Sequence, residues 1–278
     1  SREVAPLLEA KGLTKRFGGV LALAGVDFEC RAGEVHALVG ENGAGKSTLI
    51  KVLTGALEPD SGEIVTSVGG RRVFRSLNPA LAQALGIAAI YQEFNLIPNQ
   101  TIAENIFLGR LPRGGLGLVR FAEAEKGARS LLMRLGESVD PHRKVRTLSV
   151  AHQQFVEVAK ALAQDARLIL MDEPSAVLGG RNLELLFAAV RRLREQGIAV
   201  VYISHRIEEV FQIADRVTVL KDGRTVGTSL VSGFTRSDLI KMMVGRAINE
   251  QFPPRTAKLG ETILSVRHLS TADGALSD

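Results

Sequence analysis

The sequence lacks several features that mark secreted or membrane-spanning proteins. Cys30 is its only cysteine, so an intrachain disulfide is excluded, and this usage is typical of a reducing compartment. No apolar run approaches the roughly 20 residues that a membrane-spanning helix requires. No secretory signal peptide opens the chain, and because Ser1 stands where a methionine would, we expect a trimmed start. The 278 residues are enough for one large globular domain or two small ones.

A long basic run is also missing, although the formal net charge is +5. A positive balance suits nucleic acid, anionic lipid or the phosphates of a nucleotide. Without clustered Lys and Arg, the composition favours a mixed, solvated surface, and we expect no nucleic-acid partner. Hydrophobic residues make up 45% of the chain and charged residues 23%, which is ordinary for a globular protein.

One glycine-rich stretch organises the rest of the chain. It fits the pattern G-x-x-x-x-G-K-[ST] of a phosphate-binding loop. Its context agrees, because Glu34–Val39 is typical of a buried strand before it and Ser47–Leu53 of a helix after it. The residues expected to bind the phosphates are Gly40, Glu41, Asn42, Gly43, Ala44, Gly45, Lys46, Ser47 and Thr48.

Each residue type in this loop has a physical task. Glycines let the backbone wrap around phosphates with successive N–H groups pointing inward, and the helix N-terminus adds a partial positive charge. Lys46 is expected to reach the β- and γ-phosphates, and Ser47 to ligate Mg²⁺. The loop therefore predicts a bound nucleoside triphosphate together with Mg²⁺.

Three predicted strands end in polar residues that could act on the nucleotide. Asp172 and Glu173 follow one strand; Asp172 is expected to hold the metal, and Glu173 to polarise the attacking water as a general base. Gln92 and His205 follow two others, and in a parallel sheet such ends line the ligand crevice. Gln92 could contact Mg²⁺ and water, and His205 the γ-phosphate. Taken alone, either residue is more often an ordinary loop residue with its hydrogen bonds satisfied.

Phe17 has two interpretations. It lies in the polar, glycine-flanked turn Lys15–Gly19 that we predict between the strands at Leu7–Ala10 and Val20–Cys30. It could be an aromatic platform for a nucleotide base, or an edge residue that covers the end of a sheet. Without family context the second interpretation is slightly favoured.

Between about residues 95 and 165 the pattern changes from strand to helix. Thr101 and Glu104 have the spacing of a capping box, and Phe121–Leu135 has helical periodicity. Another helix with one apolar face begins near Ser149. We therefore predict a helical subdomain inserted between strands.

The end of the chain repeats its beginning. Thr262–Ser270 has the same order as Pro6–Thr14: an apolar strand, a basic residue, a small or polar residue, Leu, then Ser or Thr. A chance short strand is the alternative. We expect a first domain at 1–247, a linker at 248–260 and the truncated start of a second copy at 261–278.

Taken together, these residues resemble the ATP-binding-cassette ATPases. The matches run from Phe17 through about Gly223 in the family's order: aromatic loop, phosphate loop, glutamine loop, signature, strand carboxylates and switch histidine. Three segments are similar in sequence to the ATPases of bacterial monosaccharide importers of the ribose, xylose and galactoside type. They are Tyr91–Pro98, Glu104–Arg110 and Val244–Arg246. Those ATPases carry two cassettes in one chain, so the resemblance implies an N-terminal cassette here.

The resemblance implies an α/β fold: a P-loop NTPase (RecA-like) core with an antiparallel β subdomain and an inserted helical subdomain. It implies binding and hydrolysis of ATP with Mg²⁺, catalysed through Lys46, Glu173 and His205. Phe17 would stack on adenine. Ser149 and the N–H groups after it would serve the nucleotide site of the opposite cassette, and Gln92 would transmit closure of the two cassettes.

The resemblance also implies partners and a location. The partners are a second ATP-binding cassette in the C-terminal half of the same protein, transmembrane permease subunits and, indirectly, a sugar-binding protein. The location is peripheral, at the cytoplasmic face of the inner membrane. Two readings from other classes stay open: a cassette ATPase that acts on nucleic acid, and a regulatory nucleotide-binding module with low hydrolysis.

Two positions depart from the family pattern. The signature, usually L-S-G-G-Q, continues after Ser149 as Val150-Ala151-His152, and we expect the Ala151 methyl group to crowd an approaching phosphate. The loop after the strand carboxylates usually ends in Asp, whereas Gly179 stands here and removes a carboxylate that bridges two cassettes. We therefore hypothesise that the two composite nucleotide sites are unequal.

Overall fold

The computed structural model describes residues 5–115, 117–244 and 265. Contacts group Ser1–Gly245 into one compact unit, and the fold given below is that of its described residues. The predicted linker at 248–260 lies outside the described residues, and so does the predicted repeat at 261–278 apart from Ser265. The boundary at 247 therefore stays a prediction.

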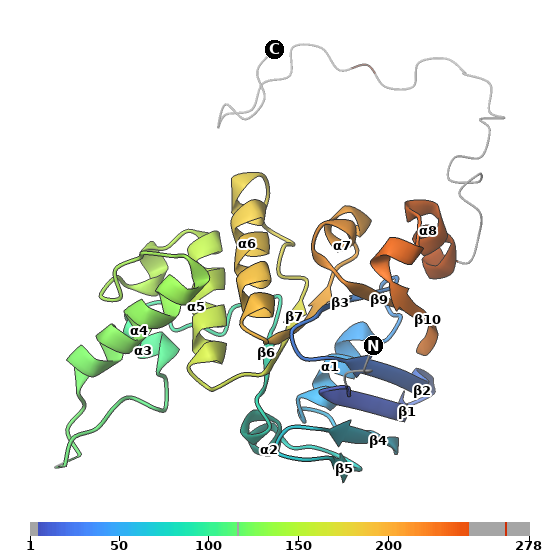
Figure 1. The fold of residues 1–278 in the computed structure, drawn as a ribbon, viewed down its shortest axis with the longest axis horizontal. Helices are drawn as coiled ribbons and strands as arrows, with labels where there is room; N and C mark the ends of the chain where they lie inside the picture. The colour runs from blue at the N-terminus through green and yellow to red at the C-terminus, as the bar shows by residue number, and fades with distance from the viewer. Residues whose placement is uncertain (1–4, 116, 245–264, 266–278) are drawn as a thin grey trace. The chain divides into compact units, whose positions relative to one another are not determined.

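A six-stranded sheet forms the core, in the order β10-β9-β3-β8-β7-β6 (Figure 1). All neighbours pair in parallel except β10, which is antiparallel to β9. Every residue of β3 and β8 is buried, as expected for apolar strands covered on both faces. The strands are β3 (Val35–Val39), β6 (Ile87–Ile90), β7 (Leu168–Asp172), β8 (Ala199–Ile203), β9 (Arg216–Lys221) and β10 (Arg224–Leu230).

Successive residues of the core strands face different layers. Ile169 and Met171 of β7 pack into the cluster that contains α6 (Arg181–Glu195), whereas Leu168 and Leu170 pack into the cluster that contains α1 (Lys46–Leu53). Helix α7 (Ile207–Ile213) follows β8, helix α8 (Arg236–Val244) comes after β10, and α7 packs beside α6 (Figure 1). The core sheet is thereby covered on both sides.

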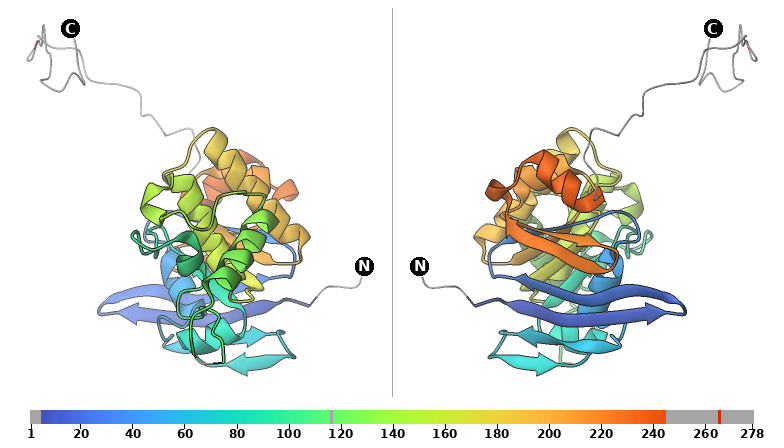
Figure 2. Two further views of the ribbon diagram at one scale, coloured as in Figure 1. Left: turned by 90° about the vertical axis from the view of Figure 1, so that its left-hand side faces the viewer. Right: turned by 90° about the vertical axis from the view of Figure 1, so that its right-hand side faces the viewer.

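A second, antiparallel sheet has the order β2-β1-β4-β5 and lies across α1 from the core sheet (Figures 1 and 2). The prediction of a turn at Lys15–Gly19 was too long. Strand β1 continues to Phe17, because Arg16 pairs with Leu21 and Phe17 with Val20, so the turn narrows to two glycines. The strands are β1 (Leu8–Phe17), β2 (Val20–Cys30), β4 (Ser61–Thr66) and β5 (Arg72–Phe74).

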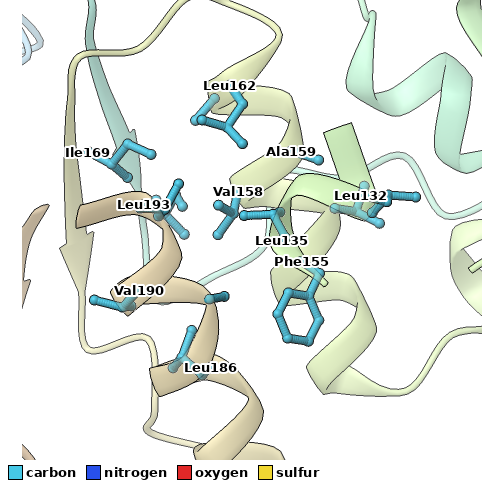
Figure 3. Packing of buried hydrophobic residues seen from close by; sticks show 14 of the residues in the cluster. Leu132, Leu135, Phe155, Val158, Ala159, Leu162, Ile169, Leu186, Val190 and Leu193 are labelled. Carbon is cyan, nitrogen blue, oxygen red and sulfur yellow. The ribbon is translucent and has the colours of Figure 1, made fainter. Parts of the chain in front are cut away.

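A group of helices fills the stretch between β6 and β7. The capping box at the start of α3 (Ile102–Ile106) is present, with Thr101 Oγ1 accepting from the Glu104 N–H and Glu104 accepting from the Thr101 N–H. Helix α4 (Phe121–Leu135) has the predicted bounds, and α5 (Val150–Leu162) packs beside it. Their apolar faces meet α6 of the core in one cluster (Figure 3). The helical group and the core therefore share buried surface.

Helix α2 (Pro79–Ala84) lies between β5 and β6 and is capped by Asn78. The Oδ1 atom of Asn78 accepts a hydrogen bond from the Leu81 N–H at 2.8 Å, and Pro79 occupies the first helical position. Among the described residues, no helix is long and apolar enough to cross a membrane.

Candidate nucleotide site

The glycine-rich loop joins the end of β3 to the start of α1, as the motif predicts. Two of its glycines are required by space as well as by conformation. A Cβ atom on Gly40 would lie 2.3 Å from the backbone oxygen of Leu220, and one on Gly45, at φ +104°, would lie 2.5 Å from that of Ala22. The loop is thus held between β9 and β2 at distances that any larger residue would prevent.

Lys46 opens α1 and bends back over the loop. Its Nζ atom donates hydrogen bonds to the backbone oxygens of Gly40 (2.8 Å) and Glu41 (2.9 Å). The residue is 6% exposed, and this burial lowers the pKa of the ammonium, whereas the nearby charges of Glu173 and Asp172 act to raise it. A cation is therefore fixed against the backbone of the loop.

Asp172 and Ser47 meet although 125 positions separate them in the chain. The Ser47 hydroxyl lies close enough to the Asp172 carboxylate to lower its pKa. Burial raises the pKa of Asp172, the Ser47 hydroxyl opposes the rise, and the Glu173 charge adds to it. Hydroxyl and carboxylate oxygens are the ligands that Mg²⁺ prefers, so this pair fits the metal.

A cage of protein ligands is not needed for such an ion. Among the described residues, no group of three or more His, Cys, Asp or Glu side chains could hold a metal. Mg²⁺ usually keeps several waters and takes one or two protein oxygens together with substrate phosphates. The Ser47–Asp172 pair therefore matches a metal that arrives with a nucleotide.

Glu173 and His205 lie beyond the ends of neighbouring strands, because β7 and β8 pair in register with Asp172 opposite Ile203. The Nδ1 atom of His205 is 3.2 Å from a Glu173 carboxylate oxygen. The Glu173 backbone has φ +48°, a left-handed conformation that non-glycine residues rarely adopt. Its N–H donates to the Ile203 backbone oxygen at 3.1 Å. Strain of this kind is typical of functional sites.

A cavity of about 540 Å³ opens over the loop. It contains most of the predicted phosphate-binding residues, together with Gln92 and Glu173. The residues that line it are Ala22, Asn42, Gly43, Gly45, Lys46, Ser47, Thr48, Gln92 and Glu173.

Asp172 and His205 do not line this cavity, but they adjoin Ser47 and Glu173, which do, whereas Phe17 and Ser149 are also absent from its lining. Phe17, at the end of β1, is 48% exposed, and the Lys15 ammonium lies 5.9 Å from the centroid of its ring. Ser149 is exposed at the N-terminus of α5, where its Oγ accepts a hydrogen bond from the His152 N–H at 3.4 Å and lies 2.8 Å from His152 Nδ1. Neither residue lines the cavity, and their roles stay predictions.

The expectation that the Ala151 methyl group crowds a phosphate was wrong. Ala151 is 3% exposed and packs in the hydrophobic cluster of α4, α5 and α6. Since Ser149 caps the helix, Ala151 falls on the same face as the buried Phe155 one turn later. The exposed departure is the neighbouring Val150, at 41%.

Sequence reasoning missed one polar cluster beside the site. Glu209 of α7 is 3% exposed and accepts hydrogen bonds from the side chains of Ser175, Tyr202 and Ser204. The available signal was a Glu at an apolar position of a short helix, which does not by itself indicate partners 34 residues away.

Comparison with known proteins agrees with this geometry. The model of the family described as ABC transporter matches residues 23–176. The chain belongs to the ABC transporter family. Among curated relatives, the Ribose import ATP-binding protein RbsA 1 of Rubrobacter xylanophilus is 56% identical over 274 residues, covering 98% of this chain and 54% of that protein. RbsA 2 of Streptomyces coelicolor is 50% identical over 278 residues, covering 100% and 53%. The chain thus spans about half the length of the curated relatives it matches.

Solved structures show the same fold. A crystal structure of the ADP conformation of an ATP-binding cassette of an ABC transporter has a TM-score of 0.75 at 26% identity, covering 87% of this chain and 100% of that one. A dimeric cassette in a post-hydrolysis state bound to ADP and Pi has a TM-score of 0.68 at 28% identity, covering 82% and 100%. The expected P-loop core with an antiparallel sheet and inserted helices is confirmed.

Proposed function

We propose that the chain is the ATP-binding and ATP-hydrolysing part of an importer of a monosaccharide. The observation that carries this proposal is the convergence of four side chains at the phosphate-binding loop. Ser47 contacts Asp172, and Glu173 contacts His205, on neighbouring strand ends. Members of the family bind nucleotides, as the ADP-bound structural neighbour illustrates. The names of the curated relatives support a sugar as the cargo.

Each residue of the site has its own role in the proposed ATP hydrolysis. Lys46 neutralises charge on the β- and γ-phosphates, and the loop's N–H groups hold the same oxygens. Ser47 and Asp172 would hold Mg²⁺, with Gln92 beside them, and the ion would supply positive charge where negative charge develops. Glu173 accepts a proton from a water that attacks the γ-phosphorus, while the bond to the β,γ-bridging oxygen breaks and ADP leaves with the electron pair. His205 orients Glu173 and contacts the departing phosphate.

The chain would work with a second cassette. Ser149 is exposed at a helix N-terminus, which suits contact with phosphates bound elsewhere. Each curated relative is about twice as long as the matched region, which leaves room for another cassette in the same protein. The proposed importer also contains transmembrane permease subunits and a sugar-binding protein. The chain would lie peripherally at the cytoplasmic face of the inner membrane.

Binding of MgATP tests the proposal. Lys46→Ala removes the fixed cation, so we expect titration calorimetry to show at least a tenfold weaker Kd for MgATP, which is about 1.4 kcal/mol. Lys241→Ala, an exposed lysine of α8, is the matched control and should bind as the wild type does. A folded wild type without affinity for MgATP, or equal affinity in the Lys46 and Lys241 variants, would contradict the proposal.

A further inference from the structure

One buried carboxylate beside the nucleotide site has no task in the mechanism above. Glu209 lies on α7, and a single oxygen, Oε2, accepts three hydroxyl hydrogen bonds. They come from Ser175 (2.6 Å), Tyr202 (2.9 Å) and Ser204 (3.0 Å). All three donors are 2% exposed or less. The other oxygen, Oε1, receives Arg206 Nη1 at 3.3 Å.

The donors connect two loops that carry the chemistry. Ser175 is two residues after Glu173, in the loop that follows β7. Ser204 is one residue before His205, at the end of β8, and its Oγ also accepts the Arg206 N–H at 2.9 Å. Glu209 therefore joins both loops within one carboxylate group.

The Glu173 backbone needs such support. Its left-handed φ of +48° is a conformation that persists only when surrounding contacts enforce it. On one side its N–H is fixed to the Ile203 oxygen, and on the other its own carbonyl accepts the Ala176 N–H at 3.1 Å. The Ser175 hydroxyl anchors the same turn to Glu209.

The two oxygens of Glu209 face four donors and act here only as acceptors. A carboxylate is purely an acceptor and has lone pairs for three hydroxyls and a guanidinium. Burial raises the pKa of Tyr202, which keeps its hydroxyl a donor. An amide in place of the carboxylate could turn its oxygen to the three hydroxyls, but this oxygen is a weaker acceptor than a carboxylate's, and the NH₂ group would face the Arg206 donor and leave that hydrogen bond unmade.

We propose that Glu209 is a positioning residue for ATP hydrolysis, which holds the Glu173 and His205 loops in one fixed relation. Through Ser175, Glu209 also holds the loop that contains Val177. Val177 is 71% exposed and lies between Ser175 and the start of α6. A second cassette that contacts this loop would then act on Glu173 and His205 together. The inference rests on the proposed function, because it concerns the geometry of that same site.

The first experiment compares Glu209→Gln with Glu208→Gln in the full-length protein. The neighbouring Glu208 has a 62% exposed side chain whose nearest ion-pair partner is Arg236 at 3.7 Å, so it controls for loss of a charge on α7. We expect Glu209→Gln to lower kcat at least about tenfold, since small misplacements of catalytic groups have effects of this size. KM and Kd for MgATP should change less than twofold, because the phosphate loop is untouched. Glu208→Gln should match the wild type in both.

The second experiment needs no hydrolysis. Nitrogen-15 NMR of the histidine side chains, with the His205 signal identified by its loss in His205→Gln, reports the contact between His205 and Glu173 in the 278-residue chain. Glu209→Gln should shift this signal, and Glu208→Gln should leave it in place. If Glu209→Gln does not fold, Ser204→Ala removes one of the donors and is expected to give the same shift with a smaller loss of kcat.

The outcomes separate the two proposals. A wild type that binds MgATP but has no ATPase activity with its second cassette present would sink the proposed function. An active wild type whose Glu209→Gln variant is folded, with unchanged kcat and an unchanged His205 signal, would sink the positioning role. If kcat and the amount of bound ATP fall in the same proportion, Glu209 supports folding only and the positioning role is wrong.

Discussion

The imidazole of His205 lies 3.2 Å from the carboxylate of Glu173, between loops that follow two adjacent parallel strands. The His205 side chain is 54% exposed and the Glu173 side chain 19%. The less exposed carboxylate therefore lies against a partner that is more open to solvent. This relationship predicts that loss of the carboxylate separates binding from turnover.

Glu173→Gln keeps the size of the side chain but removes its capacity to take a proton. We expect turnover of ATP to fall by roughly 10²–10⁴, the usual contribution of a general base, with MgATP still bound. Single-turnover hydrolysis and Kd for MgATP, measured on the same preparation, provide the check. Glu184→Gln, an exposed carboxylate on α6, is the control. Unchanged turnover in Glu173→Gln would remove Glu173 from the role of base.

The phosphate loop and the strand-end carboxylates were predictable because each is a local signal. Gly40 and Gly45 occur where β3 turns into α1, and Asp172 ends an apolar strand. That Ser47 and Asp172 lie close together was inferred only from the metal-binding role that each motif assigns to its residue. The strand order places β8 between β3 and β7, and nothing in the local pattern specifies that order.

Other features depend on packing between distant segments. Phe17 belongs to β1 because its partner Val20 extends the ladder, which the turn-like composition of Lys15–Gly19 concealed. In the sequence, Glu209 is indistinguishable from an ordinary helical residue. Its partners are seen only when α7 packs against β8. By contrast, burial of Ala151 followed from the phase of α5 once Ser149 is taken as its cap. Helix phase is a sequence property, so that prediction could have been made correctly.

A second buried carboxylate, Glu157 of α5, gives a pH-dependent prediction. Its Oε1 atom accepts the Asn95 N–H at 2.6 Å, and the Lys160 ammonium donates to the Asn95 backbone oxygen at 2.9 Å. Burial raises the pKa of Glu157, although Lys160 and the Asn95 hydrogen bond oppose the rise. Ionising Glu157 therefore costs more in the folded chain than in the unfolded one.

The sign of the pH effect follows from this raised pKa. The folded state binds the Glu157 proton more tightly, so this contribution to stability is full below the unfolded pKa and is lost as the pH rises through the folded pKa. Glu157→Gln stays neutral and keeps an acceptor for Asn95. We expect its free energy of unfolding to exceed that of the wild type at pH 8 and to match it near pH 4, measured by urea denaturation.

Glu157→Ala distinguishes the charge from the hydrogen bond. It leaves the Asn95 N–H without its acceptor, so stability should fall at both pH values, by about 1–3 kcal/mol for an unmade buried hydrogen bond. If Glu157→Gln is less stable than the wild type at pH 8, the buried carboxylate is stabilising and the predicted sign is wrong.

The loop before α6 contains two adjacent glycines that differ in what they tolerate. A Cβ atom on Gly179 or on Gly180 would meet no heavy atom within 4 Å, but only Gly180 has a left-handed backbone, at φ +52°. Gly179→Asp, which restores the carboxylate usual in the family, should therefore leave the free energy of unfolding within about 0.5 kcal/mol of the wild type. Gly180→Asp should lower it by about 1–3 kcal/mol through backbone strain.

The same pair tests whether the missing carboxylate makes the two nucleotide sites unequal. With the second cassette present, Gly179→Asp should raise hydrolysis at the slower site, because the new carboxylate can bridge the two cassettes. Gly180→Asp carries the same charge one residue away on a strained backbone and should give no gain. Site-resolved hydrolysis, with the general base of one cassette inactivated at a time, measures this directly. Equal rates at both sites of the wild type, or no change in Gly179→Asp, would show that Gly179 does not limit the reaction.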